Sequence, residues 1–339
     1  MSSIILIKLI IIQLYFTCYG SIDALSSENL RPIVGILSVD ADPPYESSIP
    51  SSYVKMIEAG GAQVVPILLN WSEEYCPEGY CVTAGSPSTD KVTKIADIYW
   101  NLAIEANNNN DHFPIWGTCL GFEIIAYLGA NGSDILSNCT GAFDQLLPIT
   151  PSAQFNSSRL FGSMPVVLQN ALIYDPMEPN FHHFCLSPES FDGNNLTRMF
   201  KSLATSKVPN GTQFVAAVEA INYPFYAVQW HPEKNVYVWD RYMKLNRGDA
   251  ANAVTAYFGR FLVKEAMKSR HKFPNPTIED EYLIYNYCPQ FTGRNNGFIT
   301  QEYIFPAQNI AKSTQIQTLT NMALVASCVL AAFCQTTVW

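Results

Sequence analysis

The sequence predicts an α/β protein in which a mostly parallel central sheet, flanked by helices, forms three layers. Two observations support this prediction: a strand, a helix and a second strand follow one another early in the chain, and strands and helices continue to alternate after them. A strand–helix–strand unit implies parallel pairing with a right-handed crossover, and continued alternation places helices on both faces. The chain has 339 residues, 48% hydrophobic and 14% charged, so it can bury a core of this size.

The first unit begins with an apolar, β-rich run at residues 31–39 (RPIVGILSV), which we expect to be a central strand. Ser51 and Ser52 can cap the helix that follows, and the glycine pair 60–61 can end it. Residues 63–69 (QVVPILL) are expected to form the second strand. The unit therefore predicts two parallel strands joined by one helix.

After an irregular segment, a short strand is expected at residues 80–83 and an amphipathic helix at 91–107. Residues 113–128 (FPIWGTCLGFEIIAYL) then read as a buried strand, a tight turn and a second helix. This strand–turn–helix segment is the one around which the candidate site is built.

The second half of the chain is less regular. Residues 149–215 are expected to mix short strands with loops, one of the strands covering 166–169. Two consecutive strands are predicted at 213–220 and 226–230, followed by an amphipathic helix at 251–266. No internal repeat is visible, so a single domain accounts for the pattern.

The N-terminal end differs from the middle of the chain. Residues 1–20 carry one lysine, an apolar run broken only by Gln13, and small residues around Gly20, which is the pattern of a cleaved signal peptide. An uncleaved anchor is the alternative. We therefore expect the folded domain to occupy residues 29–306.

A C-terminal tail, residues 307–339, follows the expected domain. Its polar first part precedes an apolar stretch at 322–334, which is too short to span a membrane comfortably. Small residues such as Ser313, a polar spacer and a hydrophobic end resemble a glycosyl-phosphatidylinositol (GPI) anchor signal, although the final QTTVW is polar. Membrane attachment through this tail is therefore one of two open interpretations.

The net charge and the glycosylation sequons limit the functions that the protein can have. The net charge is −9, from 20 Lys and Arg against 29 Asp and Glu, and no basic block occurs, so no nucleic-acid partner is expected. Six Asn-x-Ser/Thr sequons fit passage through the secretory route, where such sites receive glycans. We expect a secreted protein, extracellular or lysosomal. The candidate glycosylation sites are Asn70, Asn131, Asn138, Asn156, Asn195 and Asn210.

Nine cysteines occur, and six remain once the one in the signal and the two in the tail are set aside. If one of the six is a free nucleophile, the other five permit at most two disulfides and one unpaired thiol, and their pairing cannot be read from the sequence. A local bridge between Cys76 and Cys81 is one plausible pairing. The six are Cys76, Cys81, Cys119, Cys139, Cys185 and Cys288.

Cys119 lies between the strand and the helix of the 113–128 segment. Gly117 and Gly121 lack a Cβ, so the backbone can take strained dihedrals and let neighbouring chain approach, as a nucleophile elbow requires. The N-terminus of the helix also favours a thiolate. The alternative is a small buried hydrophobic residue at a tight turn, which describes most free cysteines.

A second motif, residues 228–233 (VQWHPE), ends a strand at His231. Glu233 follows two residues later, so in an extended chain both side chains point to the same side. An imidazole oriented by a carboxylate is what a thiol nucleophile needs as its general base. Pro232 stiffens the strand end, where α/β sheets place their chemistry. We therefore predict Cys119, His231 and Glu233 as catalytic residues.

The motifs WGTCLGFE and QWHPE resemble those of the gamma-glutamyl hydrolase family, a stand-alone branch of the class I glutamine amidotransferase-like fold. The likeness runs from PIVGIL through SYVK and NYP to YIF, so it covers most of the chain between the signal and the tail. Amidotransferases usually carry Gln at the position of Glu123 and have an attached synthetase domain. Glu123 and the lack of an attached domain both resemble the hydrolase branch.

The resemblance implies a cofactor-free cysteine hydrolase that cleaves γ-linked glutamates from folyl-poly-γ-glutamates and related γ-glutamyl peptides. Its partner is then a small-molecule substrate, and a homodimer is a further expectation. In this mechanism Cys119 attacks the γ-amide carbonyl, His231 carries the proton to the leaving amine, Glu233 orients His231, and water releases the thioester. The backbone N–H of Leu120 is expected to be one oxyanion donor.

The second oxyanion donor is where the sequence departs from the family. The family has a Pro-Gly-Gly-Ser turn after a strand, and the matching segment here is Thr83-Ala84-Gly85-Ser86. Gly85 is therefore the expected donor, although Thr and Ala replace Pro and Gly. The segment before this turn is also shorter than the family leads us to expect.

The five histidines have different expected roles. The family has a histidine in an Asn-Phe-His segment near the substrate, matched here by His182, which we predict to bind substrate. His183 faces the other side of a strand and is expected at the surface. His112 and His271 lie beside polar runs and are also expected in solvent. CxxC and HExxH are both absent, so no metal site is expected.

Two other functions fit the same residues. One is a sibling amidohydrolase of the same fold that acts on glutamine or another small γ-glutamyl amide. The other is a surface-anchored binding glycoprotein that keeps the fold but has lost catalysis, as the altered turn at Ala84 and Gly85 and the extra tail allow. Because nucleophile, base and orienting acid are all present, hydrolysis is the leading prediction.

Overall fold

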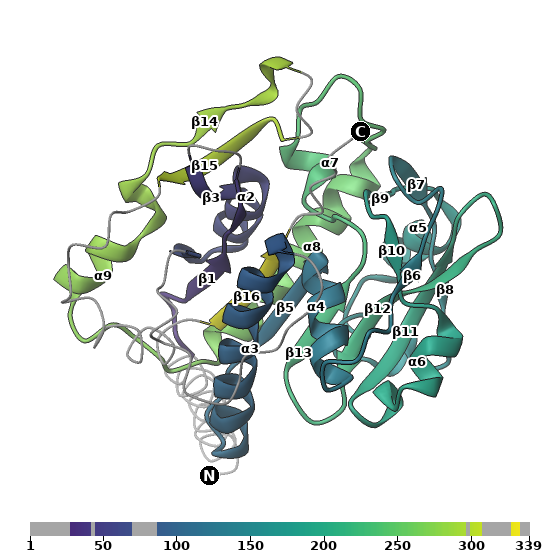
Figure 1. Ribbon diagram of the computed structural model, residues 1–339, viewed down its shortest axis with the longest axis horizontal. Coiled ribbons are helices and arrows are strands. Elements are labelled where there is room, and N and C mark those ends of the chain that lie inside the picture. The colour runs from purple at the N-terminus through teal and green to yellow at the C-terminus, as the bar shows by residue number, and fades with distance from the viewer. Residues whose placement is uncertain (1–27, 42–44, 70–86, 296–298, 307–326, 333–339) are drawn as a thin grey trace, which may run out of the picture.

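A computed structural model describes residues 28–41, 45–69, 87–295, 299–306 and 327–332. An eight-stranded sheet crosses it in the order β4-β1-β16-β5-β13-β12-β11-β8 (Figure 1). The strands from β4 to β13 run parallel, and β12, β11 and β8 continue antiparallel. The strands are β4 (Gln63–Ile67), β1 (Ile33–Leu37), β16 (Ser327–Ala332), β5 (Ile115–Cys119), β13 (Phe225–Val228), β12 (Gln213–Ala220), β11 (Phe200–Lys207) and β8 (Thr150–Pro151).

Helices cover both faces of this sheet. Successive side chains of β5 point to opposite faces: Trp116 packs against two phenylalanines of α8, and Gly117 lies against α4. Helix α3 packs against α4, and α2 against α8, so the predicted three-layer α/β fold is confirmed. The helices are α2 (Ser51–Gly60), α3 (Pro87–Asn108), α4 (Leu120–Gly129), α5 (Val166–Tyr174), α6 (Pro188–Gly193), α7 (Lys234–Tyr237), α8 (Asp249–Met267) and α9 (Pro276–Tyr282).

Three smaller sheets accompany the central one. An antiparallel sheet in the order β14-β15-β3-β2 lies beside α2 at the upper left of Figure 1, and the pairs β10-β6 and β7-β9 lie at the right. Their strands are β14 (Gln290–Phe291), β15 (Gln301–Pro306), β3 (Tyr45–Pro50), β2 (Val39–Asp40), β10 (Phe184–Cys185), β6 (Ser137–Asn138), β7 (Gln145–Leu147) and β9 (Glu178–Asn180). Short 3-10 helices occupy Phe155–Ser157, Leu196–Arg198, Ile284–Asn286 and Gly293–Asn295.

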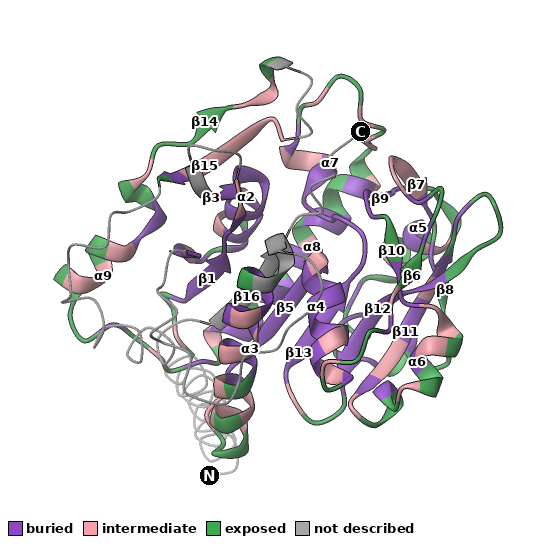
Figure 2. Ribbon diagram, viewed as in Figure 1, coloured by how far each residue is buried: buried purple, intermediate pink, exposed green. Residues whose placement is uncertain are grey.

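The core lies where the parallel strands meet. Every residue of β1, β5 and β13 is buried (Figure 2). Burial on both faces is typical of parallel strands between two helix layers, and it explains why these strands read as continuous apolar runs. The chemistry of the protein must therefore lie at the strand ends.

Most of the predicted elements are present, with two corrections. Ser51 and Ser52 lie in the first turn of α2; the N-cap is Pro50, with no side-chain cap, so the predicted serine caps are wrong. Residues 166–169, predicted as a strand, begin α5 instead. Val166 and Val167, which suggested a strand, are 67% and 71% exposed. The buried face of the helix is formed by Ala171 and Leu172. The strand predicted at 80–83 lies outside the described residues.

The C-terminal segment takes an unexpected place. Residues 327–332, expected in a tail, form β16 between β1 and β5, with Gly35 beside Cys328 and Gly117 beside Leu330. The sheet therefore extends beyond residue 306, where the domain was expected to end. Among the described residues, no helix combines the length and the apolar character that crossing a membrane requires.

Candidate active site

Cys119 sits on a strained elbow. It is the last residue of β5, α4 begins at the next residue, and its φ of 55° lies in the left-handed region that a side chain disfavours. A Cβ on Gly117 would lie 2.5 Å from the carbonyl oxygen of Gly121, so only glycine allows this close approach. The predicted strand–turn–helix elbow at Cys119 is confirmed, and its role as nucleophile stays a prediction.

The thiol of Cys119 is buried at the N-terminus of α4, where the helix dipole is positive. Cys119 is 0% exposed, and α4 starts directly after it, so the positive end of the helix dipole lies at this residue. Leu120 is the first residue of α4. The predicted oxyanion donor therefore stands at the correct end of the helix, whereas Gly85 lies outside the described residues.

His231 reaches the same edge of the sheet from the neighbouring strand. Strand β13 pairs in parallel with β5, and Val228 lies beside Thr118, the residue before Cys119. The chain then turns, and the backbone N–H of His231 donates to the carbonyl of Pro179 at 2.9 Å. The carboxyl ends of two adjacent parallel strands thus carry the thiol and the imidazole.

Glu233 contacts the imidazole, although not through the geometry that the sequence suggested. Its Oε1 lies 2.9 Å from Nδ1 of His231, and both side chains are fully buried. The backbone of Glu233 is helical (φ −74°, ψ −23°) at the start of α7, so the expected extended chain is wrong at this point. Burial lowers the pKa of His231, and the charge of Glu233 and its hydrogen bond act in the opposite direction.

Further buried polar residues surround this pair, and the sequence did not single out their roles. The hydroxyl of Tyr53 lies 3.2 Å from Nδ1 of His231. Lys234 is 1% exposed; burial lowers its pKa, while the charges of Glu233 and Cys119 raise it. Lys234 follows the QWHPE motif directly. This position next to the motif is the one feature of the sequence that could have indicated that Lys234 lies at the site.

Two buried carboxyl groups complete the surroundings. Gln229 donates to Oε1 of Glu123 at 3.1 Å, and burial raises the pKa of Glu123 to about 8. Burial also raises the pKa of Glu178, on β9, to about 8. Both carboxyl groups are therefore largely protonated at neutral pH. Their burial is a consequence of packing, which sequence motifs alone do not reveal.

His182 lies close to the catalytic pair but in a different environment. It is 0% exposed, with Nδ1 2.8 Å from the carbonyl oxygen of Phe184 and Nε2 3.1 Å from Oδ1 of Asn180. Burial lowers its pKa to about 3, so the ring is neutral in any physiological compartment. The site prediction for this residue concerns substrate contact, which the geometry by itself does not test.

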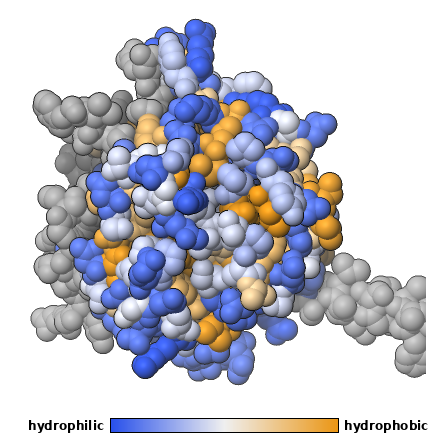
Figure 3. Space-filling model, turned by 90° about the vertical axis from the view of Figure 1, so that its right-hand side faces the viewer, coloured by the Kyte–Doolittle hydropathy of each residue, from blue (hydrophilic) through white to orange (hydrophobic). Residues whose placement is uncertain are grey.

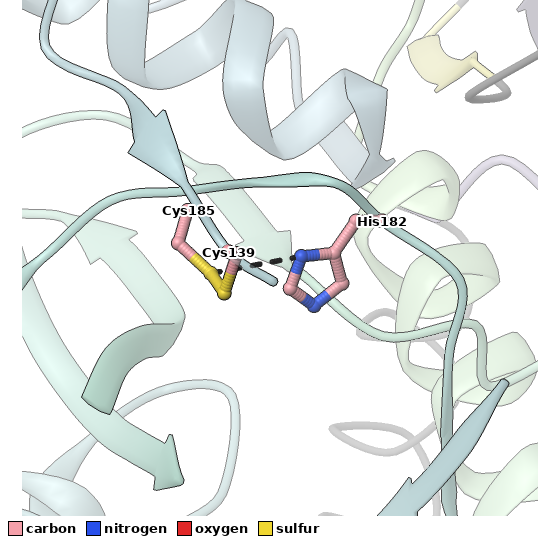
Figure 4. A group of neighbouring side chains, drawn as sticks. All are labelled: Cys139, His182 and Cys185. Carbon is pink, nitrogen blue, oxygen red and sulfur yellow. Dashed lines mark hydrogen bonds between the residues drawn. A yellow bond between two sulfur atoms is a disulfide. The ribbon is translucent and has the colours of Figure 1, made fainter. Parts of the chain in front are cut away.

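A disulfide between Cys139 and Cys185 holds the segment that carries His182 (Figure 4). Nδ1 of His182 lies 3.8 Å from Sγ of Cys185. The three side chains bring potential metal ligands within 4.8 Å of one another, but two sulfurs joined to each other are not available as thiolates. Neither the buried Cys119 nor the exposed Cys288 forms a disulfide. The bridge suggested for Cys76 and Cys81 lies outside the described residues.

Of the three other histidines, His183 confirms its expectation, His271 contradicts it, and His112 is only partly exposed. His183 is exposed, as predicted, and stacks on Phe143 with ring centroids 5.1 Å apart. The side chain of His271 is only 6% exposed and pairs with Asp111 at 3.0 Å, so the solvent position predicted for it is wrong. His112 is 29% exposed and lies 3.1 Å from Glu265. Both residues lie at the edge of the sheet opposite to Cys119, beside the start of β5.

Proteins that hold a cysteine on such an elbow, with an imidazole–carboxylate pair on the next parallel strand, form a class of thiol hydrolases with a glutamine amidotransferase-like fold. The described site has this geometry. Comparison with known proteins identifies the branch of the class.

The sequence model of the Peptidase C26 family matches residues 76–233, a range that contains the three predicted catalytic residues. Gamma-glutamyl hydrolase B of Dictyostelium discoideum is 34% identical over 321 residues, which cover 88% of this chain and 90% of that protein. The gamma-glutamyl hydrolases of Rattus norvegicus and Homo sapiens are each 33% identical and cover 81% of this chain and 90% of their own lengths. The chain belongs to the gamma-glutamyl hydrolase family.

Proposed function

We propose that this protein hydrolyses γ-glutamyl bonds of folyl-poly-γ-glutamates and related γ-glutamyl peptides through a thioester on Cys119. The observation that carries the proposal is the buried imidazole–carboxylate pair, with 2.9 Å between Nδ1 of His231 and Oε1 of Glu233, at the strand end next to the elbow. A buried pair of this kind orients a general base for a thiol.

The mechanism follows from the tautomer that Glu233 imposes. Because Nδ1–H of His231 donates to Glu233, Nε2 is the nitrogen that exchanges a proton with the thiol of Cys119. Sγ then bonds to the γ-carbonyl carbon, and the oxyanion accepts from the N–H of Leu120. Collapse breaks the C–N bond, and His231 protonates the leaving amine. Water, deprotonated by His231, attacks the thioester and frees the thiol.

The residues that contact the substrate are proposed from the charges of the substrate and of the site. Each γ-linked glutamate carries an α-carboxylate, and Lys234 is a buried basic residue next to Glu233 whose pKa is lowered by burial and raised by the charges of Glu233 and Cys119. His182, predicted to bind substrate, is neutral and can offer only hydrogen bonds or packing. The folyl part of the substrate rests on the family resemblance.

Purified mature chain tests the proposal when it is incubated with a γ-linked polyglutamate, an α-linked control and free glutamine. Turnover of the γ-linked chain alone is the expected result, and Cys119→Ala should abolish it while the circular dichroism spectrum stays unchanged. Equal turnover of the γ- and α-linked chains, or turnover of neither, contradicts the substrate assignment. Turnover of glutamine alone identifies the sibling amidohydrolase.

We propose passage through the secretory route from the sequons. The five that fall within the described residues are all exposed, which a glycan requires; Asn70 lies outside them. Shifts of electrophoretic mobility after treatment with an amidase specific for N-linked glycans, on protein from a eukaryotic host, measure this directly. Unchanged mobility, with the signal peptide at residues 1–20 still attached, contradicts the proposed route to an extracellular or lysosomal location.

The tail has two exclusive interpretations. A GPI-anchor signal is removed during processing, so it cannot also supply β16, which pairs with β1 and β5. A variant that ends at residue 306 distinguishes the two interpretations, by its thermal stability and its solubility. A large loss of thermal stability supports the strand, whereas an active, stable and newly soluble product supports membrane attachment through the tail.

A homodimer also stays a prediction. Three apolar side chains of α5 are exposed and offer a contact surface: Val166 at 67%, Val167 at 71% and Tyr174 at 75%. On the face seen in Figure 3, hydrophobic side chains are interspersed with hydrophilic ones, which fits a non-obligate interface better than an obligate one. Light scattering of the wild type and of Val167→Glu measures the oligomeric state.

A further inference from the structure

Tyr53 is a buried phenol that contacts the imidazole of His231. It lies in the first turn of α2, is 1% exposed, and places its hydroxyl 3.2 Å from Nδ1 of His231. The two rings are 6.5 Å apart between centroids and inclined by 48°. The phenol therefore meets the edge of the imidazole at the nitrogen that also faces Glu233.

Whether Nδ1 of His231 carries a hydrogen determines which group can accept the hydrogen bond of the Tyr53 phenol. Nδ1 carries one hydrogen, and Oε1 of Glu233 accepts it at 2.9 Å. A protonated Nδ1 has no lone pair for the phenolic hydrogen, so the acceptor left beside it is the carboxylate of Glu233. Burial, the charges of Glu233 and Cys119, and this hydrogen bond raise the pKa of Tyr53 well above its ordinary value, so Tyr53 remains a donor over the whole working range of pH.

We propose that Tyr53 is a positioning residue for the reaction: its O–H donates to Glu233 and holds that carboxylate against Nδ1 of His231. This inference rests on the proposed function. Glu233 lies at the N-cap of α7, a helix of four residues, so its own element constrains it little. Helix α2 packs against both α7 and α8 and provides the rigid support from which Tyr53 reaches the carboxylate.

The other titratable groups around the network are few among the described residues. Lys234 and Cys119 act on Tyr53 or Glu233 through their charges, Glu178 faces Glu233, and His182 faces His231. Glu178 is largely neutral at pH 7 because burial raises its pKa to about 8, and His182 is neutral because burial lowers its pKa to about 3. Changes at Tyr53 are therefore expected to act mainly through Glu233.

The test compares Tyr53→Phe, Glu233→Gln and the double variant. Loss of a hydrogen bond to a charged group should lower kcat of Tyr53→Phe by about 10- to 100-fold, with KM changed less than about twofold. The alkaline limb of the rate should move to lower pH, because a carboxylate that drifts from Nδ1 supports the imidazolium less. The double variant should shift no further than Glu233→Gln alone, because both changes act through one contact.

Tyr257→Phe is the matched control. Its phenol donates to the carbonyl of Leu160 at 2.8 Å and contacts Ser163, so the substitution removes a phenolic hydrogen bond outside the catalytic network. Its pH profile should coincide with that of the wild type. A Tyr53→Phe enzyme that loses activity without any shift of the limb, or a double variant with fully additive shifts, overturns the proposal.

A second readout needs no substrate. The rate of Cys119 alkylation by iodoacetamide, followed by peptide mass spectrometry as a function of pH, reports when the thiolate forms. In Tyr53→Phe this rise should occur at higher pH, because a weaker imidazolium supports the thiolate less. An alkylation profile identical to the wild type contradicts the role of Tyr53. A shifted profile in a protein that cleaves no γ-glutamyl bond supports Tyr53 and refutes only the proposed function.

Discussion

The two buried histidines beside the elbow differ in what faces their rings. His231 has a carboxylate oxygen of Glu233 2.9 Å from Nδ1, whereas His182 meets only neutral oxygens, the carbonyl of Phe184 and the side chain of Asn180. Burial lowers the pKa of both. An anion opposes that effect in His231 alone, so proton exchange is expected of His231 and not of His182.

The two histidines are also held by different means. The chain around His231 follows β13 and is bonded through its backbone to Pro179 on β9. The chain around His182 is closed by the Cys139–Cys185 disulfide, which joins the residue after β6 to β10. Catalytic chemistry and covalent support are thus separated between neighbouring segments. Four experiments test this difference between the two histidines.

Replacing each histidine by asparagine should produce the largest difference. His231→Asn removes the general acid and base, and kcat is expected to fall by about 10²- to 10⁴-fold. His182→Asn should lower kcat by less than about tenfold and act mainly on KM, because a neutral buried ring takes no proton. Steady-state kinetics on a γ-linked polyglutamate measures both. Equal losses of kcat would show that His182 takes part in proton transfer.

Removing the disulfide should affect stability and spare the chemistry. The cysteines are 46 residues apart in sequence, and a loop of that size corresponds to about 4 kcal/mol in the chain-entropy description. The double variant Cys139→Ala with Cys185→Ala should lose up to that amount in urea unfolding. Below its unfolding range it should keep the kcat of the wild type. Cys288→Ala, at an exposed free thiol, serves as the control and should change neither quantity.

His182 should also make the protein sensitive to acid. Burial lowers its pKa to about 3 from an unfolded value of 6.5, so between these values the unfolded chain binds the additional proton. The stability that neutral His182 permits is complete above about pH 6.5 and is lost as pH falls, by at most about 1.4 kcal/mol per unit. Urea unfolding at several pH values should show a shallower loss for His182→Gln. His183→Gln, at an exposed ring, should keep the wild-type slope.

The smallest expected effect is a displaced limb in the pH–rate profile. The charge of Glu233 raises the pKa of His231 against the effect of burial, so Glu233→Gln should let His231 lose its proton at lower pH. The alkaline limb should move down by about one unit. The limb of His182→Gln should stay in place. A limb that does not move in Glu233→Gln would mean that Glu233 neither orients nor charges His231.

The sequence by itself determined the elements whose cause is local. An apolar run, a glycine and apolar residues at helical spacing all occur within residues 113–128, so the strand, the elbow and the helix around Cys119 could be predicted. The QWHPE motif likewise indicated that His231 and Glu233 are partners. Their contact was predicted for an extended chain and is made by a helical turn instead, because residues so close in sequence can meet in either conformation.

Only the tertiary structure decided the contacts between distant segments. Tyr53 and His231 are 178 residues apart and meet because α2 packs against α7, the helix that follows His231. The same holds for Cys139 with Cys185, for His271 against Asp111, and for β16 between β1 and β5. No local pattern encodes such pairs. Which segments become neighbours depends on how the apolar faces of helices and strands bury one another across the whole chain.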